Sequence, residues 1–478
     1  MYFMGIKGVG MATLAVMAKE SGLRVTGSDI FEEFITDKIL KDAGIEVLLG
    51  FEAKNVDNFF EGTESHECLF IATGAHNGYD NPESIRAREL GIKVISHGEA
   101  VGLFMSGEPF GRSDFEGISV TGAHGKTTVS AMLATVLSAA GTDPSYTIGT
   151  SEVNPLGPAG HYGRGRYFVA EADEYLSEPH YDRTPKFLYQ KPVALLINNI
   201  DFDHPDFYSN IDAVKNAYLD FASIVPTDGV IVSNGDDENT REVMARLGTG
   251  VRQITFGTGE KNDFILSNFF QDGLKSNFSL RRNDILLGRF SLLVPGYHNA
   301  KNAAGVIALA MELGIGVDKI TQGLAEFEGT RRRMEVMGKT AAGQIIIDDY
   351  AHHPEEIRKT LSALKSAYPD QKIVTIFQFH TFSRTKALFS EFASAFSDAN
   401  EVIILPTFAS QRGETDTEDI DQKMVDAMKK IDKRVSLINS HESVVEYINK
   451  NFPNPDILVV VMGAGDVYKI GEALVNKQ

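Results

Sequence analysis

The stretch GISVTGAHGKTTVSAMLATVLSAAG, residues 117–141, constrains the fold of this chain more than any other. A β-branched strand leads into a short loop with two glycines, and the loop leads directly into a helix that Gly141 ends. In α/β proteins, a strand, a glycine loop and a helix in this order place an anion at the positive end of the helix. The stretch therefore predicts an α/β protein with a parallel sheet and a phosphate-binding loop.

The loop, Thr121 to Thr128, has residue types that suit nucleotide phosphates. We expect the Lys126 side chain to be exposed and to reach the β- and γ-phosphates, while the Thr127 hydroxyl binds Mg²⁺. Val120 stands where the general phosphate loop has its first glycine, so this is a shorter variant. The alternative is a solvated glycine turn followed by a lysine, which leaves the flanking strand and helix unexplained. The backbone N–H groups expected to surround the phosphates are those of Gly122, Ala123, His124, Gly125 and Lys126, and Thr128 completes the motif.

Length and composition limit the possible partners. A chain of 478 residues should divide into about three domains. The net charge of −19 repels nucleic acids and anionic lipids, so a nucleotide must be bound by backbone amides, a few cations and metal ions. The only cysteine is Cys68, which excludes an intrachain disulfide and favours a cytoplasmic location. No apolar run reaches the ~20 residues of a membrane-spanning helix, and glycines within the apolar N-terminus favour a strand–turn–helix over a signal peptide.

The first predicted domain, residues 1–111, opens as half of a doubly wound, Rossmann-like fold. A strand from Tyr2 to Ile6 is followed by glycines, by a helix from Met11 to Ser21 and by a second strand. An NAD-binding domain is the alternative here, although Thr13 replaces the third glycine of that motif. A later helix should begin near Asn81 and Pro82.

The second and third predicted domains, residues 112–329 and 330–478, repeat the alternation of strands and helices. Strands of the second domain end in acidic or polar runs, in YFVAEADE, VALLINNIDFDH and GVIVSNGDDEN. Polar residues also follow the strands of the third domain, in IIIDDYAHHP, KIVTIFQFHTFSRT and ILVVVMGAGD. Ligands of open α/β sheets bind at the carboxyl ends of the strands. We therefore expect a mixed or parallel central sheet, a doubly wound third domain and a site at these strand ends.

TGAHGKTT resembles the nucleotide loop of the Mur ligases, the enzymes that build the peptide stem of peptidoglycan precursors. The resemblance continues, in family order, through GIKGVGM, VTGSD, DNPE, EADE, NIDFDHPD, HNAKN, RRRME, DDYAHHP, FQFHTFSRT and MGAGD. It implies a UDP-sugar domain, a central ATP-binding domain and a C-terminal domain that completes the amino-acid site. The positions it implies for the UDP-sugar are Gly8, Gly10, Met11, Ser28, Asp29, Thr73 and Gly74.

The resemblance also assigns the metal and nucleotide sites. Glu171 and His204 match metal-binding positions beside Thr127, and a glutamate suits Mg²⁺, although a solvated strand end and a capping histidine are the alternatives. The helix that borders the adenine is matched by His298, Asn299 and Asn302, which could instead be capping residues.

Arg333 matches an arginine that reaches the γ-phosphate, and its neighbours Arg331 and Arg332 could simply be solvated. Asp349 matches a position near the ribose, Tyr350 and His352 match residues that face the substrates, and Arg384 matches an arginine associated with the incoming amino acid.

Two subgroups of the family remain open for the incoming group. Several Mur ligases have a carbamylated lysine in the register that falls here on Leu219, with Lys215 out of step. Without it, the chain resembles the subgroups that join L-alanine, or a whole tripeptide, to UDP-N-acetylmuramate. GIKGVGM, FQFHTFSRT and MGAGD favour L-alanine, whereas the long stretch DEYLSEPHYDRTPKF favours L-Ala-γ-D-Glu-meso-diaminopimelate. We expect L-alanine, with ATP and Mg²⁺ as cofactors and an acyl-phosphate intermediate. A phosphate-loop ATPase switch and a catalytically silent UDP-sugar sensor are the competing hypotheses.

Overall fold

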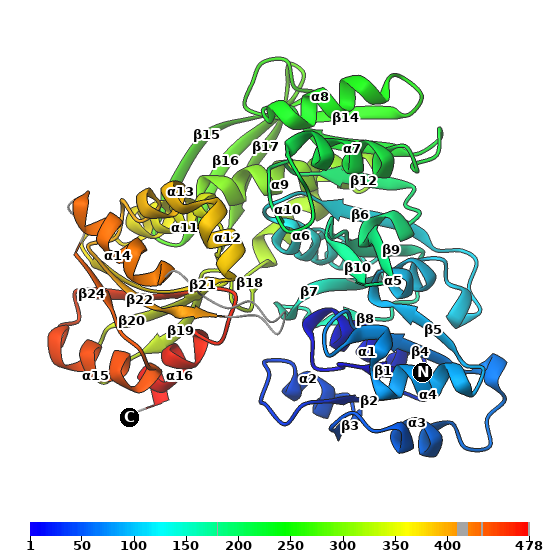
Figure 1. Ribbon diagram of the computed structural model, residues 1–478. Coiled ribbons are helices and arrows are strands. Elements are labelled where there is room, and N and C mark those ends of the chain that lie inside the picture. Colours follow the sequence, from blue (N-terminus) through cyan, green and yellow to red (C-terminus); the bar gives the residue numbers. More distant parts are fainter. Residues whose placement is uncertain (179, 409–418, 432–433, 477–478) are drawn as a thin grey trace.

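A computed structural model describes residues 1–178, 180–408, 419–431 and 434–476 of the chain. Three bodies, each built around its own sheet, follow one another along the chain (Figure 1). The N-terminal sheet lies at the lower right, the central sheet above it and the C-terminal sheet at the left of the view. The mixed α/β class expected from the sequence is confirmed.

The N-terminal sheet is fully parallel, in the order β3-β2-β1-β4-β5. Its first strand ends at Met4, two residues before the predicted end, because Gly5 takes a φ of 75° and the amides of Gly5 and Ile6 bond to the Ser28 carbonyl. This early turn lets the first helix begin at Val9, earlier than predicted. The strands are β1 (Tyr2–Met4), β2 (Thr26–Asp29), β3 (Glu46–Leu49), β4 (Leu69–Ala72) and β5 (Lys93–Ser96). The helices are α1 (Val9–Glu20), α2 (Asp37–Asp42), α3 (Ala53–Phe60), α4 (Pro82–Glu89) and α5 (His97–Met105), with 3-10 turns η1 (Ser65–Glu67), η2 (Gly78–Asp80) and η3 (Glu108–Phe110).

Helix α4 begins where the sequence predicted. Pro82 is its first residue, and the Asn81 side chain accepts a hydrogen bond from the Glu83 amide, which is the expected cap.

The central sheet has 11 strands, in the order β17-β16-β15-β14-β13-β12-β6-β9-β7-β18, with β8 beside β7. Its middle is parallel and buried under helices on both faces, which explains the unbroken apolar runs of its strands. The strands are β6 (Glu116–Thr121), β7 (Ser145–Asn154), β8 (Gly157–His161), β9 (Tyr167–Glu171), β12 (Ala194–Ile197), β13 (Val230–Asn234), β14 (Arg252–Gly257), β15 (Phe264–Asp272), β16 (Lys275–Arg282), β17 (Ile285–Leu292) and β18 (Gly329–Thr330). The helices are α6 (Lys126–Ala139), α7 (Ile211–Ala222), α8 (Glu238–Leu247), α9 (Tyr297–Glu312) and α10 (Val317–Glu326).

A separate antiparallel hairpin follows the EADE motif. It consists of β10 (Leu176–Glu178) and β11 (Asp182–Pro185) and runs into the 3-10 turn η4 (Lys186–Tyr189). Pro179, at the turn of the hairpin, lies outside the described residues. The Tyr181 hydroxyl donates to the Asp80 carboxylate at 2.5 Å, so the hairpin joins the central body to the N-terminal body.

The C-terminal sheet has the order β19-β20-β24-β21-β22-β23 and is parallel except at β19. The carboxyl ends of β20, β21 and β24 therefore meet at one edge, as the polar residues after these strands predicted. The strands are β19 (Glu335–Lys339), β20 (Ile345–Asp349), β21 (Lys372–His380), β22 (Glu401–Phe408), β23 (Val435–Leu437) and β24 (Ile457–Met462). The helices are α11 (Pro354–Ala367), α12 (Phe382–Ala387), α13 (Phe389–Ser394), α14 (Ile420–Lys430), α15 (His441–Asn451) and α16 (Tyr468–Asn476).

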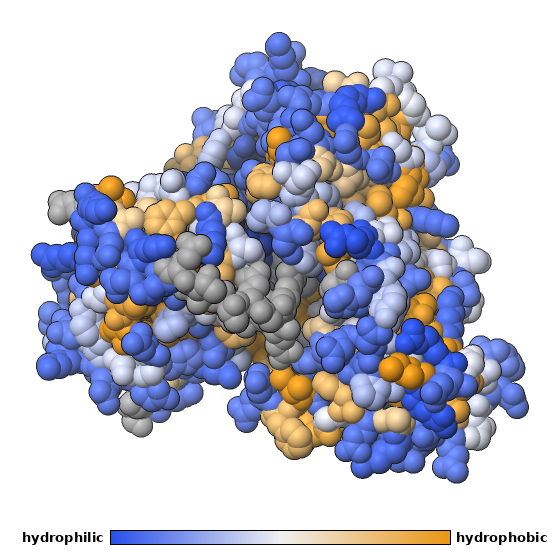
Figure 2. All heavy atoms as spheres, viewed as in Figure 1, coloured by the Kyte–Doolittle hydropathy of each residue, from blue (hydrophilic) through white to orange (hydrophobic). Residues whose placement is uncertain are grey.

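On the face shown in Figure 2, hydrophilic residues predominate and hydrophobic ones are scattered. None of the helices among the described residues is long and apolar enough to cross a bilayer.

Candidate active site

The phosphate loop has the predicted strand before it and the predicted helix after it. Gly122 and Gly125 have φ angles of 150° and 84°, which a side chain would strain, and a Cβ on Gly125 would lie 2.8 Å from Asn198 Nδ2. Helix α6 begins at Lys126, so its positive end faces the loop. Two of the amides expected to meet phosphates are engaged within the protein, because Ala123 and His124 donate to Asn199.

Lys126 is not the exposed side chain that the sequence suggested. Its side chain is 14% exposed, and its Nζ lies 2.9 Å and 3.1 Å from the two carboxylate oxygens of Glu174 and 2.8 Å from the Gly122 carbonyl. Burial alone would lower the pKa of Lys126, but the carboxylates of Glu174, Asp173 and Glu171 outweigh it and raise the pKa. The ammonium is thus charged and held by a carboxylate at the place where we expect a phosphate.

The predicted metal ligands are placed in two groups. The Thr127 hydroxyl lies 3.2 Å from Glu171, whose other oxygen accepts from the Gly149 amide at 2.8 Å. Burial raises the pKa of the Glu171 carboxyl. His204 lies instead beside Glu174, with Nε2 4.0 Å from its carboxylate, and one atom each of Asp173, Glu174 and His204 come within 4.8 Å of one another. Several hydroxyl and carboxylate oxygens lie close together here, and Mg²⁺ prefers such ligands. The residues present therefore fit a magnesium ion.

His204 is held in a strained conformation. Its φ is 57°, in the left-handed region, and its ring packs 4.4 Å from that of Tyr175. Non-glycine residues with this φ gather at functional sites, where neighbouring structure compensates the strain. The ring lies between two carboxylates, those of Glu174 and Asp203.

Asn302 and Asn299 belong to a chain of buried amides that ends at the phosphate loop. Asn198 Nδ2 donates to the His124 carbonyl at 3.0 Å and to Asn302 Oδ1 at 2.9 Å. Asn302 Nδ2 donates to Asn299 at 3.3 Å, and Asn299 donates to the Pro295 carbonyl at 2.8 Å. Helix α9 is therefore tied to the loop. Its His298 remains neutral, because burial and then Lys359 and Arg333 lower the pKa to about 3.

Arg333 lies at the junction between the central and C-terminal sheets. Its two neighbours, Arg332 and Met334, have φ angles of 60° and 47°, which fixes the backbone around it. Its guanidinium lies 5.2 Å from the centre of the Tyr350 ring and 3.9 Å from Glu356. Arg332 is not solvated, as the sequence had allowed, but buried, and it donates to Asp348 and to the Gly463 carbonyl.

Asp349, the last residue of β20, binds backbone amides at the junction between the central and C-terminal sheets. Its two oxygens accept from the amides of Met334 and Ala351, both at 2.8 Å. Burial raises the pKa of the carboxyl.

Arg384 of α12 reaches the central body. Its guanidinium donates twice to Asp203 Oδ1, at 2.9 Å and 3.2 Å. Burial raises the pKa of Asp203, but His204 and Arg384 outweigh burial and hold it well below its usual range. His352 lies nearby; its Nδ1 is 3.0 Å from the Tyr350 carbonyl, and burial and Arg384 lower its pKa to about 4.

The glycine turn of the N-terminal body forms a second predicted cluster. Asp29 accepts from the amides of Lys7 and Ile30, at 2.7 Å and 2.8 Å. A Cβ on Gly10 would lie 2.5 Å from the His97 ring, so the turn needs glycine there. Ser28 points away from the turn, since it is fully buried and donates to Glu83. The remaining residues, Gly8, Met11, Thr73 and Gly74, surround the ends of β1 and β4.

Several functional candidates were missed by sequence reasoning. Asn198 and Asn199 hold the phosphate loop, Glu174 holds Lys126, and Asp203 holds Arg384. Each lies in one of the strand-end motifs NNIDFDH and EADE, but its partner lies far away in the sequence.

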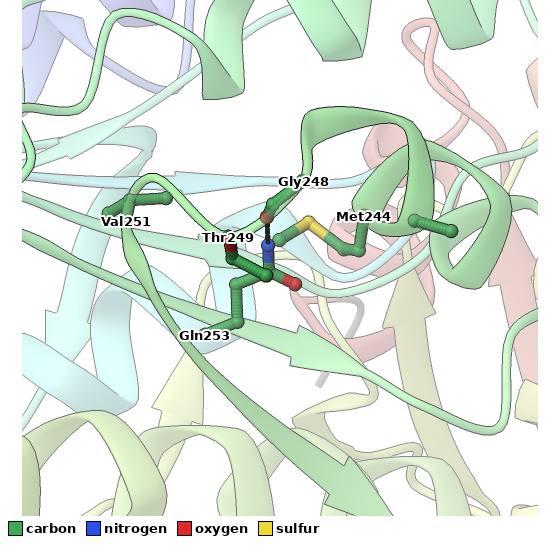
Figure 3. Close-up of a pocket in the computed structure, with 6 residues that line it drawn as sticks. Met244, Gly248, Thr249, Val251 and Gln253 are labelled. Carbon is green, nitrogen blue, oxygen red and sulfur yellow. Dashed lines mark hydrogen bonds between the residues drawn. The ribbon is translucent and has the colours of Figure 1, made fainter.

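A hollow elsewhere on the central body has no such chemistry. Figure 3 shows it between the end of α8 and the start of β14, with Gln253 donating to the Gly248 carbonyl. Its lining has no charged side chain and consists of Met244, Ala245, Gly248, Thr249, Val251 and Gln253.

Comparison with known proteins agrees with this arrangement of sheets and motifs. Residues 1–108 match the Mur ligase family catalytic domain, residues 120–310 the Mur ligase middle domain and residues 332–465 the Mur ligase glutamate ligase domain. The chain belongs to the Mur ligase family, as the sequence motifs predicted.

Its relatives and structural neighbours are particular members of that family. It is 38% identical to the UDP-N-acetylmuramate–L-alanine ligase of Desulfitobacterium hafniense, over 99% of each chain. It is 36% identical to the enzyme of that name from Caldanaerobacter subterraneus, over 100% of this chain and 97% of the relative. The crystal structure of UDP-N-acetylmuramate–alanine ligase from Thermotoga maritima matches with a TM-score of 0.79 and 26% identity, over 99% of this chain and 97% of that one. A murein peptide ligase from Psychrobacter arcticus shares the fold, with a TM-score of 0.73, 23% identity and the same coverage.

Proposed function

We propose that this Mur ligase joins L-alanine to the carboxylate of UDP-N-acetylmuramate, with ATP and Mg²⁺, in peptidoglycan precursor synthesis. One observation carries the proposal: a row of charged and titratable side chains runs from the phosphate loop to the C-terminal body. Lys126 pairs with Glu174, His204 lies between Glu174 and Asp203, and Asp203 pairs with Arg384. This row joins the loop expected to bind the γ-phosphate to the body expected to bind the amino acid, and the acyl-phosphate reaction must bring these two groups together. The full-length similarity to L-alanine ligases supports the same substrate pair.

In this proposal each body has one task. Residues 1–111 bind the UDP-sugar, residues 112–329 bind ATP, and residues 330–478 complete the nucleotide and amino-acid sites. UDP-sugar contacts are assigned to the turn around Gly8, Gly10, Met11, Asp29, Thr73 and Gly74. Ser28 is left out of this set, because its hydroxyl is buried and donates to Glu83. Nucleotide contacts are assigned to Gly122–Thr128, His298, Asn299, Asn302, Arg333 and Asp349. A solved MurF ligase of Thermotoga maritima is a complex with ADP, and it has this fold at 16% identity and a TM-score of 0.64.

The reaction proceeds in two steps. A muramoyl carboxylate oxygen attacks the γ-phosphorus of ATP, the bond to the β-phosphate oxygen breaks, and ADP leaves an acyl phosphate behind. The amine of L-alanine then attacks the acyl carbon, the tetrahedral intermediate collapses, and phosphate leaves as the amine loses its proton. Activation is needed because a carboxylate oxygen is a poor leaving group until it is phosphorylated.

The residues of the chain offset charge and orient the reactants. Lys126 and Arg333 place positive charge where two anionic reactants meet. Magnesium held by Thr127 and Glu171, and by His204 in the neighbouring group with Asp173 and Glu174, would screen the same repulsion. His352, neutral at pH 7 because its pKa is about 4, can accept a proton from the incoming amine, and Arg384 can bind the amino-acid carboxylate.

Tripeptide addition is the second candidate, and the β10–β11 hairpin favours it. This long hairpin is what resembles the tripeptide-adding subgroup. In the structure the hairpin contacts the N-terminal body, through the hydrogen bond from the Tyr181 hydroxyl to the Asp80 carboxylate. That role explains its length without a larger incoming group, so L-alanine remains the proposal.

Isotopic labelling tests the chemistry. With UDP-N-acetylmuramate labelled with ¹⁸O in the muramoyl carboxylate, we expect one labelled oxygen in each phosphate released, because the carboxylate oxygen bonded to phosphorus leaves with it. Phosphate release should require L-alanine. Unlabelled phosphate released without any amino acid would instead identify an ATPase and contradict the proposal.

A further inference from the structure

Glu356 lies where three separate segments of the site meet. It is the third residue of α11, and its side chain is only 12% exposed. One carboxylate oxygen lies 3.4 Å from His124 Nδ1, in the phosphate loop, and 3.9 Å from the guanidinium of Arg333. The other oxygen accepts from the His352 amide at 3.1 Å. A single carboxylate therefore contacts the loop, the junction arginine and the segment after β20.

His124 is enclosed by carboxylates on both sides of its ring. Nε2 lies 3.3 Å from Asp201, which belongs to the central body, and Nδ1 faces Glu356, which belongs to the C-terminal body. Although burial lowers the pKa of His124, Asp201 and Glu356 outweigh it and raise the pKa to about 9. With a proton on each nitrogen, the ring faces one carboxylate on each side.

The adjacent glutamate has the opposite environment. The Glu355 side chain is 45% exposed and pairs with Arg358 at the surface. Both glutamates lie in the first turn of α11, where its dipole stabilises a carboxylate. Helix propensity and the dipole therefore do not distinguish the two positions, and only Glu356 faces the phosphate loop.

We propose that Glu356 is a positioning residue that docks the C-terminal body onto the phosphate loop through His124 and holds Arg333 and His352 in register with it. The contact between His124 and Glu356 is an ion pair at 3.4 Å, and its burial limits screening by solvent and salt. Glu356 touches neither the phosphates nor the amino acid in this account; it acts through the residues that do. Its kinetic consequences rest on the ligase activity proposed above, whereas its structural consequence does not.

The test compares Glu356→Gln with Glu355→Gln, which is the matched control. A third variant, His124→Gln, removes the other partner of the contact between His124 and Glu356. The first measurement is hydrogen–deuterium exchange of the full chain without ligands. Exchange over residues 122–128 should rise in Glu356→Gln and His124→Gln and stay at the wild-type level in Glu355→Gln. This arm does not depend on the reaction.

The second measurement is steady-state ligation. Glu356→Gln should lower kcat about tenfold, because fewer molecules reach the docked arrangement, and leave the KM for UDP-N-acetylmuramate unchanged. A merely structural role would not separate kcat from KM in this way. The double variant His124→Gln, Glu356→Gln should be no slower than the slower single variant, since both remove one contact.

Two results would overturn the inference. One is equal behaviour of Glu356→Gln and Glu355→Gln in both measurements, and the other is multiplication of the two single effects in the double variant. If the wild-type chain shows no ligation, the proposed function fails, and the exchange measurement still decides the role of Glu356.

Discussion

Replacing Lys126 by alanine should reduce ligation by about 10³-fold or more, because its ammonium is placed to contact the transferred phosphoryl group. In the structure this ammonium is paired with Glu174 and with the Gly122 carbonyl. ATP must therefore compete with Glu174 for the lysine, and the alanine variant leaves that buried carboxylate without its cation. Phosphate release in the presence of all substrates measures the effect.

Two further variants separate the causes. Lys365→Ala removes an exposed lysine that pairs with Asp398 and should keep wild-type activity. Lys126→Ala combined with Glu174→Gln removes the stranded charge, so it should recover thermal stability but not activity. Retention of more than about a tenth of wild-type phosphate release by a folded Lys126→Ala would contradict the assigned role.

Arg384→Ala is expected to affect stability and activity together. The guanidinium is 7% exposed and is paired with Asp203, so its loss leaves a buried carboxylate uncompensated, at a cost of about 3–5 kcal/mol. Activity should fall by about 10²-fold or more, because α12 and the central body lose the contact that places the incoming amino acid. Thermal unfolding and steady-state ligation measure the two effects.

The chain offers a close control for this variant. Arg358→Ala removes an arginine that pairs with Glu355 on the surface and should change the free energy of unfolding by about 0–1 kcal/mol. Arg384→Ala with Asp203→Asn removes the stranded charge, and should restore stability while leaving ligation impaired. If that double variant regained activity, Arg384 would serve only to neutralise Asp203.

The sequence predicted what depends on local pattern. The phosphate loop, the helix after it and the Asn81 cap all lie where strand, glycine and capping residues placed them. Family motifs added residues that periodicity alone cannot distinguish, although their ligands remain proposals.

What the sequence did not predict depends on partners that lie far apart along the chain. Lys126 was expected to be exposed because its neighbours are loop residues, yet Glu174, 48 residues away, covers it. Glu356 was overlooked beside Glu355, since adjacent glutamates at a helix start look alike until the His124 loop is placed against one of them. A solvated Arg332 stayed possible from the sequence, because the run RRRME gives no sign that Asp348 and Gly463 lie within reach.

The identity of the incoming group is tested most directly by competition. The chain is supplied with ATP, Mg²⁺, UDP-N-acetylmuramate and equal concentrations of L-alanine and L-Ala-γ-D-Glu-meso-diaminopimelate, and the products are identified by mass spectrometry. We predict that UDP-N-acetylmuramoyl-L-alanine forms with the higher kcat/KM and accounts for nearly all product. Predominant formation of the tripeptide adduct would contradict the proposal, and the β10–β11 hairpin would then mark a site for the larger group.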